Sequence, residues 1–137
     1  MAITYTNTTY DNVIDSLHTI ISDEFKIPLR YDEHKGNQSF LITPLDNTLI
    51  GFLSDGQARD YAINISYQFL PSGNYSKNSV EQVTEIAEKM KRLIQNNTAY
   101  SPSSTYKWHD GRIESVIYNE DNAVLQFNCT SREVSLN

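Results

Sequence analysis

The sequence predicts an α+β fold: a single domain with a mainly antiparallel β-sheet and two α-helices packed on one face, in the order α-β-β-β-β-α-β-β. Two segments, residues 11–25 and 80–94, repeat apolar residues at three- and four-residue spacing, which is typical of amphipathic helices. The remaining segments alternate apolar and polar residues between turn-forming Pro, Gly and Asn. No internal repeat or linker divides the 137 residues, so residues 1–137 are expected to form one domain.

The first helix is expected from Asp11 to Phe25. Its apolar stripe is formed by Val13, Ile14, Leu17, Ile20, Ile21 and Phe25. Thr8, Thr9 or Asp11 is expected to cap its start. Pro28 prevents the helix from continuing, because proline has no backbone N–H and clashes with the preceding turn.

Four strands are expected after this helix, over residues 28–31, 39–43, 48–53 and 60–69. Turns are predicted around Pro44, Asp46 and Asn47, and again over residues 54–57. The last of the four strands shows the clearest alternation, with apolar Tyr61, Ile63, Ile65, Tyr67 and Phe69 on one face. That strand is expected to have one buried face and one hydrated face.

The second helix is expected to begin with a capping box, in which Ser79 is the N-cap and Gln82 occupies the third helical position. Its apolar stripe is formed by Val83, Ile86, Ala87, Met90, Leu93 and Ile94. A closing hairpin is predicted from residues 106–118, interrupted near 109–111, and residues 123–134, with Leu125, Phe127 and Cys129 on one face.

Composition excludes several classes of protein. With 11 Lys+Arg against 17 Asp+Glu, the formal net charge is −6, which argues against a domain that grips nucleic acid through its phosphates. Cys129 is the only cysteine, so no intrachain disulfide and no Cys-rich zinc site can form. No apolar run approaches the roughly 20 residues that a membrane span requires. The first ten residues do not resemble a secretory signal, so folding in a reducing cytoplasm is expected.

The search for catalytic residues finds no constellation. There is no glycine-rich phosphate loop and no nucleophile elbow, and Cys129 lies within an alternating strand pattern that favours a buried structural thiol. Asp32-Glu33-His34 and His109-Asp110 would suit a metal if they met, but each lies in a polar, turn-like segment. We therefore expect no catalytic residue, no cofactor and no metal.

Nine tyrosines suggest an assembly component. Several fall in predicted loops, among them Tyr10, Tyr31, Tyr100 and Tyr118. Tyrosine is favoured at protein interfaces because it combines apolar area with a polar hydroxyl. The uncovered edges of the predicted sheet also invite pairing with a neighbour.

This layout resembles that of the tail terminator proteins of long-tailed bacteriophages, the minor tail protein U family. The resemblance depends on the amphipathic helix at 13–25, the loop Asp55-Gly56-Gln57-Ala58-Arg59, the strand ending in 67–71, the helix at 80–94 and the hairpin through Trp108 and Phe127. It covers nearly the whole chain and concerns layout and length rather than a signature motif.

The resemblance implies a structural virion protein of the tail or neck that is not an enzyme. Such proteins form a ring, usually of six subunits, that stops polymerisation of the tail tube and joins it to a head-completion or connector protein. DNA would pass through the lumen without specific binding. Loops of the family reach neighbouring subunits, which makes the loop Asp55–Arg59 and the segment Asp32–Gln38 candidates, with Lys35, Asp55, Gln57 and Arg59 as interface residues.

Other functional hypotheses stay open at this point. Another neck, head-completion or tail-assembly ring would differ in its partner rather than in its physics. A small metal-dependent enzyme or ligand-binding module would use His34 and His109. Asn-X-Ser/Thr sequons would suit a secreted adhesin, against which the missing signal weighs.

Overall fold

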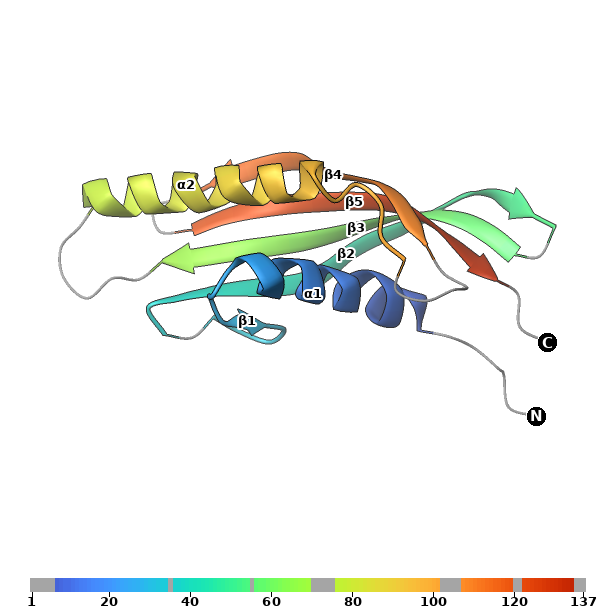
Figure 1. Ribbon diagram of the computed structural model, residues 1–137, viewed down its shortest axis with the longest axis horizontal. Coiled ribbons are helices and arrows are strands. Elements are labelled where there is room, and N and C mark those ends of the chain that lie inside the picture. The colour runs from blue at the N-terminus through green and yellow to red at the C-terminus, as the bar shows by residue number, and fades with distance from the viewer. Residues whose placement is uncertain are drawn as a thin grey trace.

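Five strands form one sheet in the order β1-β2-β3-β5-β4, and all neighbours except β1 and β2 run antiparallel. The computed structural model describes residues 7–34, 36–54, 56–69, 76–101, 107–119 and 122–134. The elements are a π-helical segment η1 (Thr9–Ile14), α1 (Asp15–Glu24), β1 (Leu29–Arg30), β2 (Gln38–Leu53), β3 (Gly56–Phe69), α2 (Ser76–Gln95), β4 (Trp108–Tyr118) and β5 (Asn122–Val134). The predicted α+β domain with two helices and a mostly antiparallel sheet is confirmed (Figure 1).

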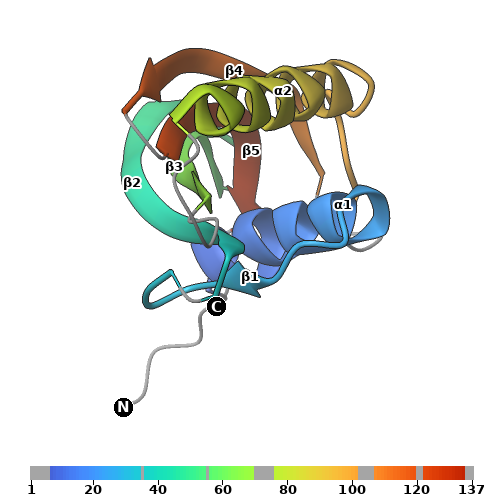
Figure 2. The same cartoon turned by 90° about the vertical axis from the view of Figure 1, so that its left-hand side faces the viewer.

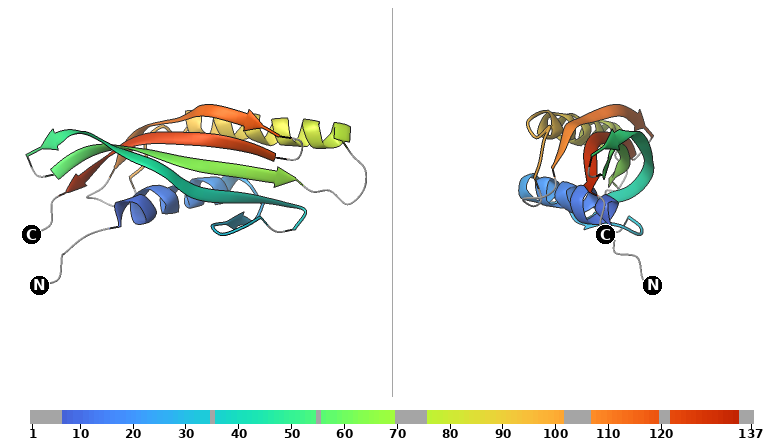
Figure 3. Two further views of the ribbon diagram at one scale, coloured as in Figure 1. Left: turned by 180° about the vertical axis from the view of Figure 1, so that it is seen from behind. Right: turned by 90° about the vertical axis from the view of Figure 1, so that its right-hand side faces the viewer.

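Both helices pack on the same face of the sheet. The sheet curves around them (Figure 2), and seen from behind, its opposite face carries neither helix (Figure 3). Alternate residues of the two central strands are buried under the helices: Tyr61, Ile63, Ile65 and Tyr67 of β3, and Ala123, Leu125, Phe127 and Cys129 of β5. Burial of each large apolar side chain stabilises the fold by about 1.5–3 kcal/mol, which holds the helices on this face.

The register of the central strands matches the sequence pattern. Tyr61 lies opposite Cys129, and Ile63 lies opposite Phe127. Directly opposed residues share a face, so the predicted common face of Leu125, Phe127 and Cys129 is confirmed, and all three are buried.

The predicted turn at residues 44–47 is wrong. Two predicted strands, 39–43 and 48–53, form the single long strand β2, which passes this point with a register shift between Pro44 and Asp46. A bulge inserts an extra residue and accommodates a proline without ending the hydrogen-bonded ladder. The element order is therefore α-β-β-β-α-β-β, with one strand fewer than predicted.

The predicted loop Asp55–Arg59 is also largely wrong. β3 begins at Gly56, with Gln57 opposite Phe52 and Arg59 opposite Leu49. The polar residues of this segment extend a strand instead of leaving the sheet, because β5 pairs with them on the other side.

The helix starts differ from the prediction as well. The first helix starts as a π-helical turn at Thr9, without a side-chain cap, and α1 ends at Glu24. α2 starts at Ser76, so Ser79 lies inside the helix and is not its N-cap. A helix end is weakly specified, because water can satisfy the free N–H groups of the first turn at several starting points.

The predicted interruption of the last hairpin is confirmed. A register shift separates His109 from Arg112, and Asp110 adopts a left-handed conformation with φ of 56°. The N–H of Gly111 turns outward and donates to the carbonyl of Thr98 at 2.8 Å. A Cβ at Gly111 would lie 2.7 Å from the indole ring of Trp108, so this position requires glycine.

Candidate assembly surface

The β2–β3 hairpin extends beyond both helices, at the right of Figure 1. We call residues 45–53 and 56–60 the distal hairpin. Its exposed large apolar side chains are Leu45, Leu49, Ile50, Phe52 and Leu53, and the side chain of Phe52 is 78% exposed. Apolar side chains gathered in this way on a domain surface mark an interaction site rather than scattered surface variation.

The register assigns a face to two of these apolar residues. Leu49 lies opposite Arg59 and Phe52 lies opposite Gln57. Both partners alternate with the buried Tyr61 along β3, so Leu49 and Phe52 belong to the face that carries the helices. Their exposure follows because neither helix reaches this end of the sheet (Figure 1).

Gln57 and Arg59, two of the predicted interface residues, lie together on the distal hairpin. Arg59 donates from Nε to Gln57 Oε1 at 3.0 Å and from Nη1 to Asn47 Oδ1 at 2.6 Å. Its Nε lies 3.7 Å from a carboxylate oxygen of Glu133 on β5. Arg59 thus already has partners in its own chain, and its contact with a second subunit stays a prediction. Lys35 and Asp55 lie outside the described residues.

Glu133 also accepts a hydrogen bond from the hydroxyl of Tyr61. Burial, and then this hydrogen bond, raise the pKa of Tyr61 far above the ordinary value for a phenol. The Glu133 carboxylate therefore links β5 to β3. Through Arg59, which donates to Asn47, the link extends to β2, at the point beyond which no helix packs on the sheet. Sequence reasoning missed Glu133, because nothing near residue 133 signals a partner some 70 positions earlier.

In the part of the chain that the structure describes, β2 and β4 each have a stretch of free edge, without a strand partner. β1 pairs with β2 only at Phe40 and Leu41, and no described strand lies beside β2 after that. On the other side, residues 98–100 hydrogen-bond with Trp108 and Gly111 of β4. No described strand pairs with the outer edge of β4 from Arg112 to Tyr118.

A groove of about 290 Å³ lies next to the free edge of β4. It is lined by Lys91, Ile94 and Gln95 of α2, by Thr98, and by Gly111, Arg112 and Ile113 of β4. Ile94 is buried and Ile113 half-buried, so the floor is apolar, whereas the two charged residues in the lining are cations. The groove can receive an apolar side chain presented by a neighbour.

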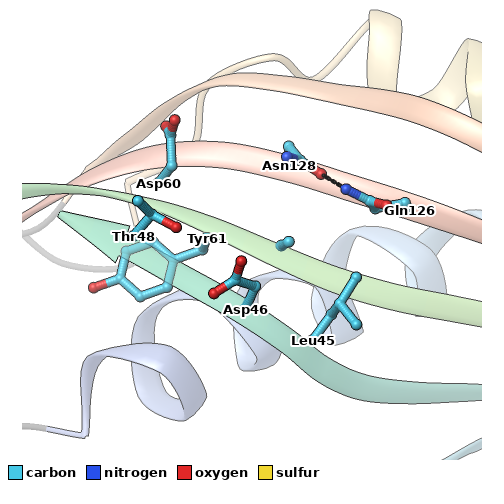
Figure 4. A pocket seen from close by; sticks show the side chains of 8 residues that line it. Leu45, Asp46, Thr48, Asp60, Tyr61, Gln126 and Asn128 are labelled. Carbon is cyan, nitrogen blue, oxygen red and sulfur yellow. Dashed lines mark hydrogen bonds between the residues drawn. The ribbon is translucent and has the colours of Figure 1, made fainter. Parts of the chain in front are cut away.

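The outer face of the sheet carries a polar hollow of about 490 Å³ (Figure 4). Asp46 and Thr48 of β2, Asp60 of β3, and Gln126 and Asn128 of β5 contribute to its lining. Gln126 donates to Asn128 at 2.9 Å, and Thr130 donates to Asp60 at 2.6 Å. These amide and carboxylate groups give the face hydrogen-bonding capacity and negative charge.

The two histidine segments lie at different places on the sheet. His34 is hydrogen-bonded through Nδ1 to Ser39 at 2.7 Å and through Nε2 to Ser66 at 3.1 Å. His109, in contrast, lies on the edge strand β4 beside Asp110. Among the residues that the structure describes, no three His, Cys, Asp or Glu side chains gather as metal ligands.

The described tyrosines divide between surface and core. Tyr10 and Tyr31 are exposed with ring centroids 6.0 Å apart, and Tyr31 shares a 2.7 Å hydrogen bond with His18. Tyr118 is exposed near the end of β4. Tyr100, predicted in a loop, is half-buried, stacks on the buried Trp108 and so packs against the core.

No helix within the described ranges is both long enough and apolar enough to cross a membrane. No protein-family model matches the chain. A search among curated proteins finds no match either.

Proposed function

We propose that this chain is a structural virion protein of a long-tailed bacteriophage, a tail terminator that forms a closed ring on the head-proximal end of the tail tube. Six copies are the number that the resemblance in layout implies. The ring would stop polymerisation of the tube and offer a surface to a head-completion or connector protein.

The observation that carries this proposal is the pair of free sheet edges. The long strands β2, β3, β5 and β4 alternate in direction, so the two edge strands are antiparallel to one another. The free edge of β4 in one copy would therefore meet the free edge of β2 in the next in the antiparallel sense used throughout the domain. Two different surfaces joined head to tail form a heterologous contact, and such contacts produce a ring when the rotation closes.

The charge of the chain supports a passive role toward DNA. Each copy has a formal net charge of −6, and the outer face of the sheet bears Asp46 and Asp60. Like charge disfavours the counterion-releasing contacts that hold DNA, so DNA would pass through a ring of such copies without sticking. Tight, salt-sensitive binding of the isolated protein to DNA would count against this part of the proposal.

The deciding experiment measures mass in solution by light scattering across a concentration series, with and without purified tail tubes. A hexamer, or a monomer that closes into rings on tube ends and halts their growth, is the expected result. A ring of twelve that ignores tube ends would favour another neck or head-completion protein. A strictly monomeric protein that leaves tube growth unchanged would refute the proposal.

A further inference from the structure

We draw no further inference here: the strongest candidate, the exposed apolar surface of the distal hairpin around Leu49 and Phe52, carries none, because nothing in the structure shows what covers it.

Discussion

The hydroxyl of Tyr61 on β3 donates a hydrogen bond to the carboxylate of Glu133 on β5, directly beside the uncovered distal hairpin. Arg59 contacts the same carboxylate at 3.7 Å, with both charged side chains about 30% exposed or less. The 3.7 Å separation is longer than a hydrogen bond, so the hydrogen bond from the buried phenol is the stronger of the two contacts.

Replacing Tyr61→Phe is expected to lower the free energy of unfolding by about 1.5 kcal/mol, because the ring remains packed while a charge-assisted hydrogen bond is lost. Denaturant titration followed by circular dichroism measures the change. Tyr118→Phe is the control, since its exposed hydroxyl should be worth less than about 0.5 kcal/mol. Equal losses in the two variants would contradict the assigned role of Glu133.

Alkaline pH is expected to destabilise the fold through its buried phenols. Burial raises the pKa of Tyr61 and of Tyr67 above the ordinary value of 10.0. The contribution of these two phenols to stability is fully present below about pH 10. It is lost as the pH rises further, because the unfolded chain releases protons that the folded chain retains. The free energy of unfolding should therefore decrease as the pH rises above about 10, and Tyr61→Phe should reduce that decrease. A decrease of the same size in the variant would show that Tyr61 titrates normally.

Gly111→Ala is expected to cost about 1–3 kcal/mol. The new methyl group would meet the Trp108 ring at 2.7 Å and the Thr98 carbonyl at 3.2 Å, and a packed core yields little room. Trp108 is the only tryptophan in the chain, so its fluorescence during denaturant unfolding reports the change directly. The matched control is Gly51→Ala on β2, where a Cβ meets nothing within 4 Å and stability should stay within about 0.5 kcal/mol.

Asp110→Gly is expected to raise the free energy of unfolding by up to about 1 kcal/mol. The φ of 56° at Asp110 is strained for a residue with a side chain, and glycine adopts it freely. Asp110→Ala should be less stable than the parent protein, since alanine tolerates this conformation less well than aspartate. Thermal denaturation of the three proteins gives the order, and a glycine variant less stable than the parent protein would refute the strain argument.

The elements with strict periodicity could be predicted from the sequence. The stripe of Val13, Leu17 and Ile21 predicted the first helix, and the alternation around Ile63 and Ile65 predicted β3. In both segments the spacing of the apolar residues shows directly which face is buried. Turn-forming residues were less informative. Pro44 and Asp46 predicted a turn, although β2 continues past this point because it pairs with β3 on both sides of it. Tertiary pairing overrides local turn preference where a bulge can absorb the misfit.

The candidate assembly surface was only partly accessible to sequence reasoning. Gln57 and Arg59 were singled out as loop residues, and they lie on the distal hairpin but in a strand. Phe52 was treated as an ordinary strand residue, because periodicity assigns a face but does not reveal where the helices end. The apolar run around Ile50 and Phe52, in a stretch with few charges, was the signal that could have marked this end of the sheet.

The position of β5 in the sheet has a consequence for how the chain folds. β5 is the last of the described strands along the chain, yet it lies between β3 and β4, and its contacts with β3 join residues some 70 positions apart. A ribosome-bound chain can close the β2–β3 hairpin early, but the other edge of β3 has no strand partner until β5 has been synthesised. Such long-range strand pairing is slow and leaves an aggregation-prone intermediate. We therefore expect truncation within β5 to cause aggregation during synthesis rather than a mild loss of stability.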